Sequence, residues 1–241
     1  KFFKGKTQKF LQSGCEMSNP SLWFNNCKKV ICIGRNYAAH AAELNNPLPK
    51  GKPLFFLKPP SSLLSQGHAI LIPQSSQSVH HEVELGVVIG GEKILSSLAA
   101  PPSSKDYKQM VAGYTCAIDL TARDIQQIAK EKGLPWTEAK GYDTFCPVGE
   151  FIHAEKISDP QDLSLFLSVN GKMRQQGNSK DMIFSVADII YHLSHIMSLY
   201  PGDLILTGTP EGVDQIQPGD TIEAGIQGFS SMTFDVQSRQ Q

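Results

Sequence analysis

The sequence lacks several features that would assign it to a specialised class. Lys+Arg total 22 and Asp+Glu total 23 among 241 residues, so the formal net charge is -1 at pH 7. The basic excess that nucleic-acid-binding proteins normally carry is missing. Charged residues make up only 19% of the chain and hydrophobic residues 40%, a composition that supports a folded core. No run approaches the roughly 18 apolar residues of a membrane-spanning helix. The charge balance therefore argues against nucleic acid as a partner, and the lack of such a run argues against a membrane.

Cysteine is scarce as well. The five cysteines, at positions 15, 27, 32, 116 and 146, are odd in number and form no C-x-x-C pair. The chain also has no Asn-x-Ser/Thr sequon with a non-proline middle residue. These absences argue against a secreted, disulfide-stabilised fold and indicate a reducing compartment.

Common catalytic and nucleotide-binding motifs are missing too. The sequence contains no G-x-G-x-x-G loop and no G-x-S-x-G nucleophile motif. His81-Glu82 is followed by no histidine at the spacing of zinc peptidases. A nucleotide site and a zinc-peptidase site are therefore not expected.

The first part of the chain differs from the rest. Residues 1–27 are expected to be an N-terminal extension, followed by a single domain over residues 28–241. The first 14 residues contain four lysines and no acid. Such a segment is either flexible or the remnant of a transit peptide, although it lacks the arginines typical of one. The compartment therefore stays open between the mitochondrion and the cytoplasm.

The pattern along residues 28–241 predicts many short strands and a few helices. Strands are expected near 28–33, 54–57, 69–73, 80–90, 111–118, 163–169, 204–206, 221–226 and 231–236. Helices are expected over 35–44, from Thr121 to Gly133 with Thr121 and Asp124 as a variant capping box, and after a cap formed by Ser185 and Asp188. The helices do not alternate regularly with the strands. The fold is therefore predicted to be α+β with a mixed or rolled sheet, not a doubly wound one.

Three acidic residues form a candidate metal site. Glu82 and Glu84 are two apart on an expected strand, so their side chains leave the same face, and Asp119 ends another strand. Neighbouring buried carboxylates repel each other, and a divalent cation removes that penalty. Three carboxylates describe an oxygen-preferring site, so Mg²⁺ or Mn²⁺ is expected before Zn²⁺. The spacing is also compatible with glutamates on the solvent-facing side of an edge strand.

Seven segments resemble the fumarylacetoacetate hydrolase family. In chain order they are GRNYAAHAAE, FFLKPPSS, HHEVELGVVIG, IDLTARDIQ, LPWTEAKGYDTFCPVG, MIFSVADII and GDLILTGTPEGV. The resemblance covers residues 28–236 and is strongest to a single-domain branch of acylpyruvases and oxaloacetate decarboxylases. It implies a mixed β-sheet roll with a few peripheral helices, usually assembled as a homodimer.

The resemblance implies the metal ligands and a catalytic pair. Glu82, Glu84 and Asp119 match the family's metal ligands, with Mg²⁺ expected and Mn²⁺ as the alternative. His40 and Glu43 match a catalytic pair on a short lid helix, where the carboxylate orients the imidazole that activates a water. Without the surrounding segment, the same spacing would describe an ordinary surface pair.

The resemblance also implies the residues that face the substrate. Lys140 matches a catalytic lysine that faces the substrate oxygens. Arg35, Gln126 and Thr209 match positions that contact substrate. Lys58 is a weaker candidate, either as a substrate contact or as an orienting salt bridge.

The implied activity is metal-dependent hydrolysis of acylpyruvates. A 2,4-dioxo acid such as acetylpyruvate or fumarylpyruvate would be cleaved to a carboxylic acid and the enolate of pyruvate. Oxaloacetate would give the same pyruvate enolate by loss of CO₂. An isomerase or keto-enol tautomerase of 2-oxo diacids is the alternative, and a catalytically silent binding protein is the third hypothesis. The His40 and Glu43 pair favours hydrolysis. Asp214 stands where relatives commonly have glycine, which leaves the acyl-group preference open.

Overall fold

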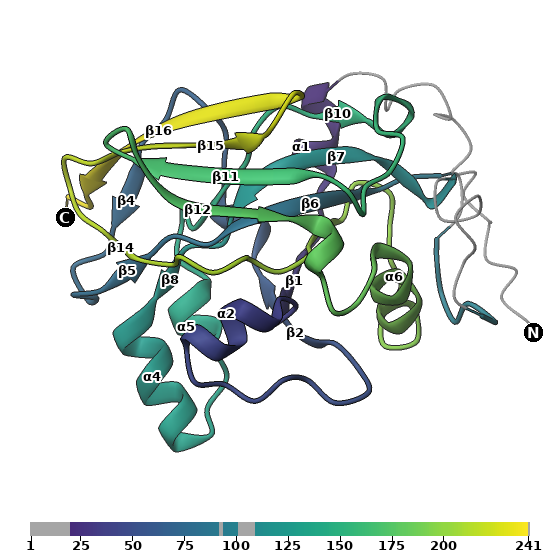
Figure 1. The fold of residues 1–241 in the computed structure, drawn as a ribbon, viewed down its shortest axis with the longest axis horizontal. Helices are drawn as coiled ribbons and strands as arrows, with labels where there is room; N and C mark the ends of the chain where they lie inside the picture. The colour runs from purple at the N-terminus through teal and green to yellow at the C-terminus, as the bar shows by residue number, and fades with distance from the viewer. Residues whose placement is uncertain (1–19, 92–93, 101–108, 241) are drawn as a thin grey trace, which may run out of the picture.

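Six strands form a mixed sheet at the centre of the fold, in the order β10-β7-β6-β13-β1-β2 (Figure 1). The computed structural model describes residues 20–91, 94–100 and 109–240. The strands are β1 (Val30–Gly34), β2 (Leu54–Lys58), β6 (Val83–Ile89), β7 (Val111–Ile118), β10 (Ile152–His153) and β13 (Leu204–Leu206). Neighbouring strands are antiparallel except β1 and β13, which run parallel. The expected α+β class is confirmed.

A second sheet packs on the first, in the order β12-β11-β15-β16-β4. Its strands are β4 (Ile70–Ile72), β11 (Ser164–Val169), β12 (Lys172–Asn178), β15 (Thr221–Ile226) and β16 (Ser230–Ser238). Shorter strands form two small sheets: β5 (Val79–His80), β8 (Thr121–Ala122) and β14 (Gln215–Ile216) in one, β3 (Leu63–Leu64) and β9 (Cys146–Pro147) in the other. Sheet therefore dominates the fold.

The helices lie outside the sheets. They are α1 (Pro20–Asn26), α2 (Ala38–Glu43), α4 (Arg123–Lys132), α5 (Thr137–Lys140) and α6 (Val186–Ser194), with 3-10 turns η1 (Pro60–Ser62), η2 (Ala154–Lys156) and η3 (Ser179–Asp181). Helices α2, α4 and α5 gather on one side of the sheets, at the bottom of Figure 1. Helix α5 contacts α4, β2 and β8, which ties this group to the central sheet.

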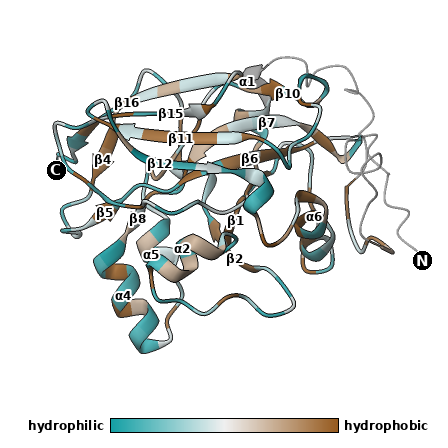
Figure 2. Cartoon of the chain, in the orientation of Figure 1, coloured by the Kyte–Doolittle hydropathy of each residue, from teal (hydrophilic) through white to brown (hydrophobic). Residues whose placement is uncertain are grey.

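The core lies between the two sheets. Every residue of β6 is buried, because β7 and β13 flank the strand and the second sheet covers it. Val83, Leu85 and Val87 of β6 share one apolar cluster with Leu165 and Leu167 of β11. Apolar colouring is concentrated on these inner strands, whereas α4 is largely hydrophilic (Figure 2). Burial on both faces explains the continuous apolar run at the end of β6.

Several local sequence signals are realised where expected. Ser185 and Asp188 form a complete capping box at the start of α6. Gly133 ends α4 in the left-handed conformation, with φ 64°. Asn170 and Gly171 both have positive φ in the turn between β11 and β12, as a tight hairpin requires. The expected strands are all observed, although residues 80–90 divide between β5 and β6.

The start of α4 differs from the prediction. Thr121 was expected to cap this helix with Asp124, but Thr121 and Ala122 pair as β8 and the helix starts without a side-chain cap. The Thr121 hydroxyl donates instead to Glu82 Oε1, at 2.9 Å. Asp124 accepts from Ser76 Oγ at 2.7 Å. As a cap, the Thr121 hydroxyl would accept from a backbone N–H; here the hydroxyl donates a charge-assisted hydrogen bond to a buried carboxylate, which fixes the side chain away from the helix start.

Part of the expected N-terminal extension packs on the domain. Residues 1–19, including Cys15, lie outside the described residues, but α1 follows them directly. Trp23 and Cys27 are buried in a second apolar cluster with Val88 and Leu204. The four described cysteines are buried free thiols. No helix in the described part of the chain is long and apolar enough to cross a membrane.

Candidate active site

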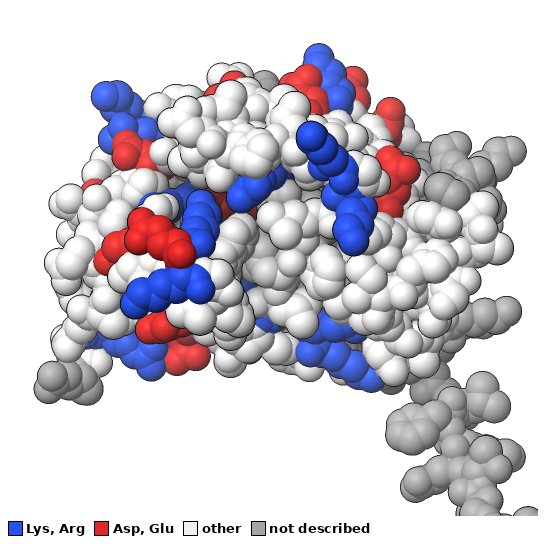
Figure 3. Space-filling view, turned by 90° about the horizontal axis from the view of Figure 1, so that it is seen from below, with Lys and Arg blue, Asp and Glu red and all other residues white. Residues whose placement is uncertain are grey.

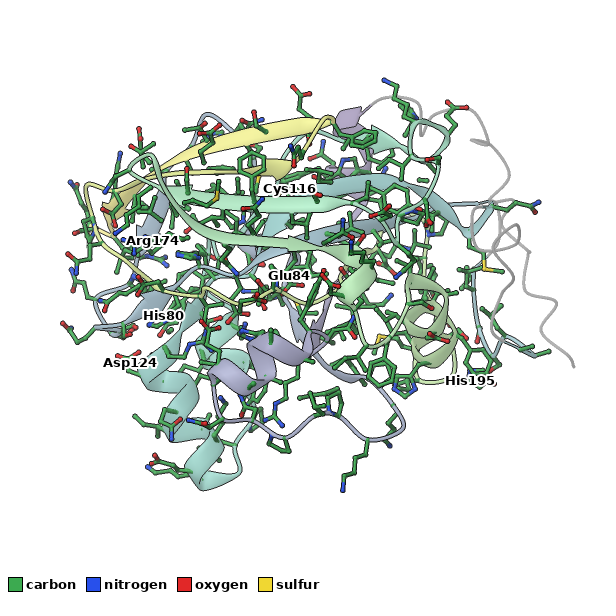
Figure 4. The ribbon with its side chains drawn as sticks, viewed as in Figure 1. His80, Glu84, Cys116, Asp124, Arg174 and His195 are labelled. Atoms are coloured by element: carbon green, nitrogen blue, oxygen red, sulfur yellow. The ribbon has the colours of Figure 1, made fainter. Side chains whose placement is uncertain are left out.

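The predicted site residues converge on one pocket between the central sheet and helices α2, α4 and α5. Eight of them line it: Arg35, His40, Glu82, Glu84, Asp119, Gln126, Lys140 and Thr209. The ninth, Glu43, is on α2 and contacts His40. Glu84 lies near the centre of the molecule, above α2 in the view of Figure 4. The tertiary fold therefore brings together residues that are far apart in sequence.

The three acids form a tight, buried cluster. Relative exposures are 6% for Glu82, 1% for Glu84 and 1% for Asp119, and one oxygen of each lies within 4.8 Å of the others. Strand pairing explains the cluster, because Val83 pairs with Ile118 and the Asp119 N–H donates to the Glu82 carbonyl at 2.8 Å. The alternative of a solvent-facing edge strand is wrong, since β6 is central and flanked on both sides.

Cationic and neutral donors hold these carboxylates in place. Lys140 Nζ lies 2.6 Å from Asp119 Oδ2 and 3.2 Å from Glu82 Oε2. Arg123 Nη2 donates to Glu82 Oε1 at 2.6 Å. The backbone N–H of Gly208 donates to Glu84 Oε2 at 2.6 Å. Glu84 is thus the acid without a cationic hydrogen-bond donor among the described residues.

The pKa values of the cluster follow from these contacts. Burial raises the pKa of Glu84 well above its usual range, and the charges of Asp119 and Glu82 raise it further. Burial also opposes ionisation of Glu82, but Lys140 and Arg123 lower its pKa below the ordinary value. Burial alone would lower the pKa of Lys140, yet Asp119 and Glu82 raise it above its usual value. Lys140 is therefore an ammonium ion at neutral pH.

The donor set fits a divalent cation. Asp119 Oδ1 is buried and accepts no hydrogen bond from any described residue. Lys58 Nζ lies 2.8 Å from it, but its hydrogens are directed to the carbonyls of Leu120, Lys140 and Phe145, at 2.9, 2.7 and 2.9 Å. A buried carboxylate oxygen that accepts no hydrogen bond, beside two further carboxylates, is the environment that Mg²⁺ or Mn²⁺ satisfies. Lys58 does not line the pocket, so its geometry favours the orienting role.

His40 and Glu43 form the expected contact on α2. His40 Nδ1 lies 3.3 Å from Glu43 Oε2, which leaves Nε2 for a ligand. Glu43 Oε1 accepts from the Gly212 N–H at 3.0 Å. Gly212 has φ 92°, and a Cβ there would lie 2.1 Å from the Arg174 carbonyl oxygen. The loop after Thr209 therefore anchors the carboxylate that orients His40.

The three predicted substrate contacts differ in their free hydrogen-bonding capacity. Thr209 Oγ1 donates to the Val83 carbonyl at 2.8 Å, so its proton is already used. Gln126 Oε1 accepts from Arg123 Nη1 at 2.9 Å, which leaves the Gln126 amide hydrogens for a ligand. Arg35, at φ 60°, is half-buried and makes no hydrogen bond or ion pair with other described residues. Arg35 is the contact with the most unused donors.

Three further residues of this site were not predicted from the sequence. Arg123 and Lys130 line the pocket from α4, and their spacing from Gln126 along one helical face could have indicated them. Gln175, on β12, supports Thr209 with a hydrogen bond of 2.8 Å. No local pattern around Gln175 marks it, because its partners come from other strands.

Comparison with known proteins gives consistent matches. Residues 29–237 match the family described as Fumarylacetoacetate (FAA) hydrolase C-terminal. A Dictyostelium discoideum protein named mitochondrial oxaloacetate decarboxylase is 51% identical over 211 residues, covering 87% of this chain and 94% of that protein. An Arabidopsis thaliana protein named mitochondrial oxaloacetate tautomerase FAHD1 is 50% identical over 218 residues, covering 90% and 94%.

Solved structures agree with the sequence matches. The crystal structure of yeast ynq8, a fumarylacetoacetate hydrolase family protein, has a TM-score of 0.80 at 36% identity, covering 91% of this chain and 96% of that chain. Fumarylpyruvate hydrolase from Pseudomonas aeruginosa, in complex with Mn²⁺ and pyruvate, has a TM-score of 0.80 at 32% identity, covering 88% and 91%. With the family match over residues 29–237, these likenesses establish that the chain belongs to the fumarylacetoacetate hydrolase family.

Proposed function

We propose that this chain is a mitochondrial, divalent-metal-dependent enzyme that converts oxaloacetate by a reaction in which an enolate forms. The observation that carries the proposal is the Lys140 ammonium between Asp119 and Glu82, in a buried site whose donors suit Mg²⁺ or Mn²⁺. The Dictyostelium relative is named an oxaloacetate decarboxylase and the Arabidopsis relative an oxaloacetate tautomerase, and both are named as mitochondrial proteins. Both reactions develop negative charge on the C2 oxygen of an enolate, that of oxaloacetate in tautomerisation and that of pyruvate in decarboxylation, so one site can support both.

Lys140 stabilises the negative charge that develops on the enolate oxygen. Glu82, Glu84 and Asp119 would hold the metal ion, which would supply Lewis acidity toward the 2-oxo group. Lys140 is protonated because its acidic neighbours raise its pKa, so it acts as a hydrogen-bond donor and not as a base. A fixed positive charge at this position stabilises the transition state more than the neutral ketone.

We assign His40 to proton transfer at C3 of the substrate. His40 lines the pocket, and Glu43 orients its ring through Nδ1. Imidazoles can accept and return a proton near neutral pH. In tautomerisation the enol oxygen loses a proton and C3 gains one. In decarboxylation the C3–C4 bond breaks, CO₂ leaves with neither electron of that bond, and C3 takes up a proton.

Hydrolysis of acylpyruvates is the second candidate activity, and the anchoring of Glu43 favours it. Glu43 accepts from Gly212 and contacts His40, so the imidazole is held as the base of an oriented pair. His40 would take a proton from a water whose oxygen attacks C4 of a 2,4-dioxo acid. The C3–C4 bond then breaks, a carboxylic acid is released, and the pyruvate enolate takes the proton.

Three assays with the same sample test the proposal. Loss of the oxaloacetate enol absorbance, release of pyruvate and loss of the acetylpyruvate absorbance would be followed with Mg²⁺, with Mn²⁺ and after EDTA. We expect metal-dependent turnover of oxaloacetate, with enol loss alone indicating tautomerisation and pyruvate release indicating decarboxylation. Turnover of neither substrate by folded, Mn²⁺-bound protein would overturn the proposal. Sedimentation of this sample would test the expected homodimer.

A further inference from the structure

Two cationic side chains in the pocket have no acidic partner among the residues that the structure describes. Lys140 and Arg123 also line it, but both pair with carboxylates of the metal centre. Arg35 and Lys130 line the same pocket and form no ion pair with any residue that the structure describes. On the side of the molecule where α2 and α4 lie, Lys and Arg side chains stand beside Asp and Glu side chains, so the outer surface there has no single sign of charge (Figure 3). Uncompensated cations in a concave site favour an anionic ligand.

Lys130 is held toward the pocket by its position on α4. It follows Gln126 by one helical turn and Arg123 by two, so the three side chains share one face of the helix. Its Nζ lies 5.7 Å from the centroid of the Trp136 ring, which also lines the pocket. A cation–π contact orients the ammonium without neutralising it. The positive charge therefore remains available to a ligand.

The surroundings of Lys130 disfavour the charged, ammonium form of its side chain. Burial lowers the pKa of Lys130, and the positive charges of Arg123 and Arg35 lower it further. An anion bound among these cations would relieve the repulsion. The attraction would also exceed that of an exposed ion pair, because the pocket is partly shielded from water.

We propose that Lys130 and Arg35 bind the distal carboxylate of a 2-oxo diacid whose 2-oxo acid end lies at the metal centre. This inference rests on the proposed function, because it takes the acidic cluster as the site of the reacting end. The pocket then has opposite polarity at its two ends. A four-carbon diacid such as oxaloacetate matches that polarity. Acetylpyruvate does not, since a neutral acetyl group replaces the distal carboxylate.

The subsite would influence which reaction oxaloacetate undergoes. Decarboxylation converts the distal carboxylate into neutral CO₂. A cation bound to that carboxylate therefore stabilises the ground state more than the transition state. Tautomerisation keeps both carboxylates throughout, so it loses no such contact. Lys130 should accordingly favour tautomerisation over decarboxylation.

The test compares Lys130→Met with Lys132→Met, an exposed position on the same helix. Methionine keeps an apolar stem against Trp136 and removes only the charge. We expect Lys130→Met to lower the ratio of kcat/KM for oxaloacetate tautomerisation to that for acetylpyruvate cleavage by about tenfold, mainly through KM, because a charge-assisted contact is lost. Lys130→Arg should restore most of the ratio, and Lys132→Met should leave it unchanged.

A binding measurement keeps the inference testable even if turnover is absent. Malate and lactate share a 2-hydroxy acid end, and only malate has a distal carboxylate. In calorimetric titrations with Mg²⁺, Lys130→Met should weaken malate binding by about tenfold and change lactate binding less than twofold. Equal losses for both ligands, or an unchanged selectivity ratio, would overturn the subsite. Wild-type protein that binds malate better than lactate but turns over neither substrate would overturn the proposed function alone.

Discussion

The side-chain amide of Gln175 donates a hydrogen bond to the Thr209 hydroxyl, with 2.8 Å between Nε2 and Oγ1. The bond joins the second sheet, to which Gln175 belongs, to the pocket that Thr209 lines. The oxygen of the same amide lies 2.8 Å from His81 Nδ1 and accepts from the Val83 N–H at 3.0 Å. Thr209 in turn donates to the Val83 carbonyl. Gln175 therefore fixes both Thr209 and the start of β6, the strand beside the candidate metal ligands.

Replacing Gln175 should destabilise the protein. Gln175→Leu leaves buried polar groups of His81, Val83 and Thr209 without their partner. Each unsatisfied group is costly, so we expect the free energy of unfolding to fall by roughly 2 to 4 kcal/mol in urea denaturation. Gln127→Leu, at an exposed position on α4, is the matched control and should change it by less than about 0.5 kcal/mol. Equal effects of the two substitutions would contradict the structural role of Gln175.

The sequence predicts those parts of the fold whose causes are local. Ser185 and Asp188 are three residues apart and cap α6 wherever the helix packs. The Asn170-Gly171 turn likewise depends only on backbone preferences. Gln175 is different, because its partners His81, Val83 and Thr209 lie 94, 92 and 34 residues away. Only the packing of the two sheets brings these groups together.

The candidate site, like the fold, is predictable from the sequence only where its causes are local. Glu82 and Glu84 share a face because the strand period is two, so their pairing could be inferred from spacing alone. Their burial could not, since it depends on which strands flank β6. Thr121 has the spacing of a helix cap, but a buried carboxylate competes for its hydroxyl. The orienting role of Lys58 depends on carbonyls 62 to 87 residues away, which no local pattern encodes.

Removing one carboxylate should abolish tight metal binding without unfolding the protein. Burial and the neighbouring acids raise the pKa of Glu84, so a neutral amide in Glu84→Gln suits the metal-free protein. We expect Mn²⁺ affinity to fall at least about 100-fold, more than loss of an outer partner typically causes. Thermal shifts with Mn²⁺ measure this, because bound metal stabilises the folded state. Glu223→Gln, on an exposed position of β15, should bind Mn²⁺ like the wild type.

Substituting Gly212 should impair hydrolysis more than stability alone explains. Gly212 and Gly228 both have positive φ, at 92° and 81°, so an alanine at either position costs about 1 kcal/mol. Only at Gly212 would the new Cβ meet backbone, 2.1 Å from the Arg174 carbonyl oxygen. The loop must then move and release Glu43. We expect Gly212→Ala to lower kcat for acetylpyruvate about tenfold and Gly228→Ala to lower it less than twofold. Equal kcat values for the two variants would contradict the anchoring of Glu43.

Asp124, in the first turn of α4, accepts several hydrogen bonds that should make its contribution to stability depend on pH. Burial tends to raise the pKa of Asp124, but hydrogen bonds from Ser76 Oγ and the Gln77 and Ile125 N–H groups, at 2.7, 2.8 and 2.9 Å, lower it below its ordinary value. The ionised side chain therefore stabilises the folded state fully above its unfolded pKa, about 3.9, and this contribution is lost as pH falls through the folded value.

Asp124→Asn should accordingly lower the free energy of unfolding at pH 7 by about 1 kcal/mol, because hydrogen bonds to a partly exposed carboxylate contribute at the low end of the usual range. Urea denaturation from pH 7 to pH 3 should show the difference from wild type shrinking below about pH 4, where the wild-type carboxylate begins to take up its proton. Asp143→Asn, at an exposed carboxylate 3.0 Å from Arg239, should stay within about 0.5 kcal/mol of wild type throughout. A difference for Asp124→Asn that stays constant down to pH 3 would mean that the ionised side chain is not what stabilises this cluster.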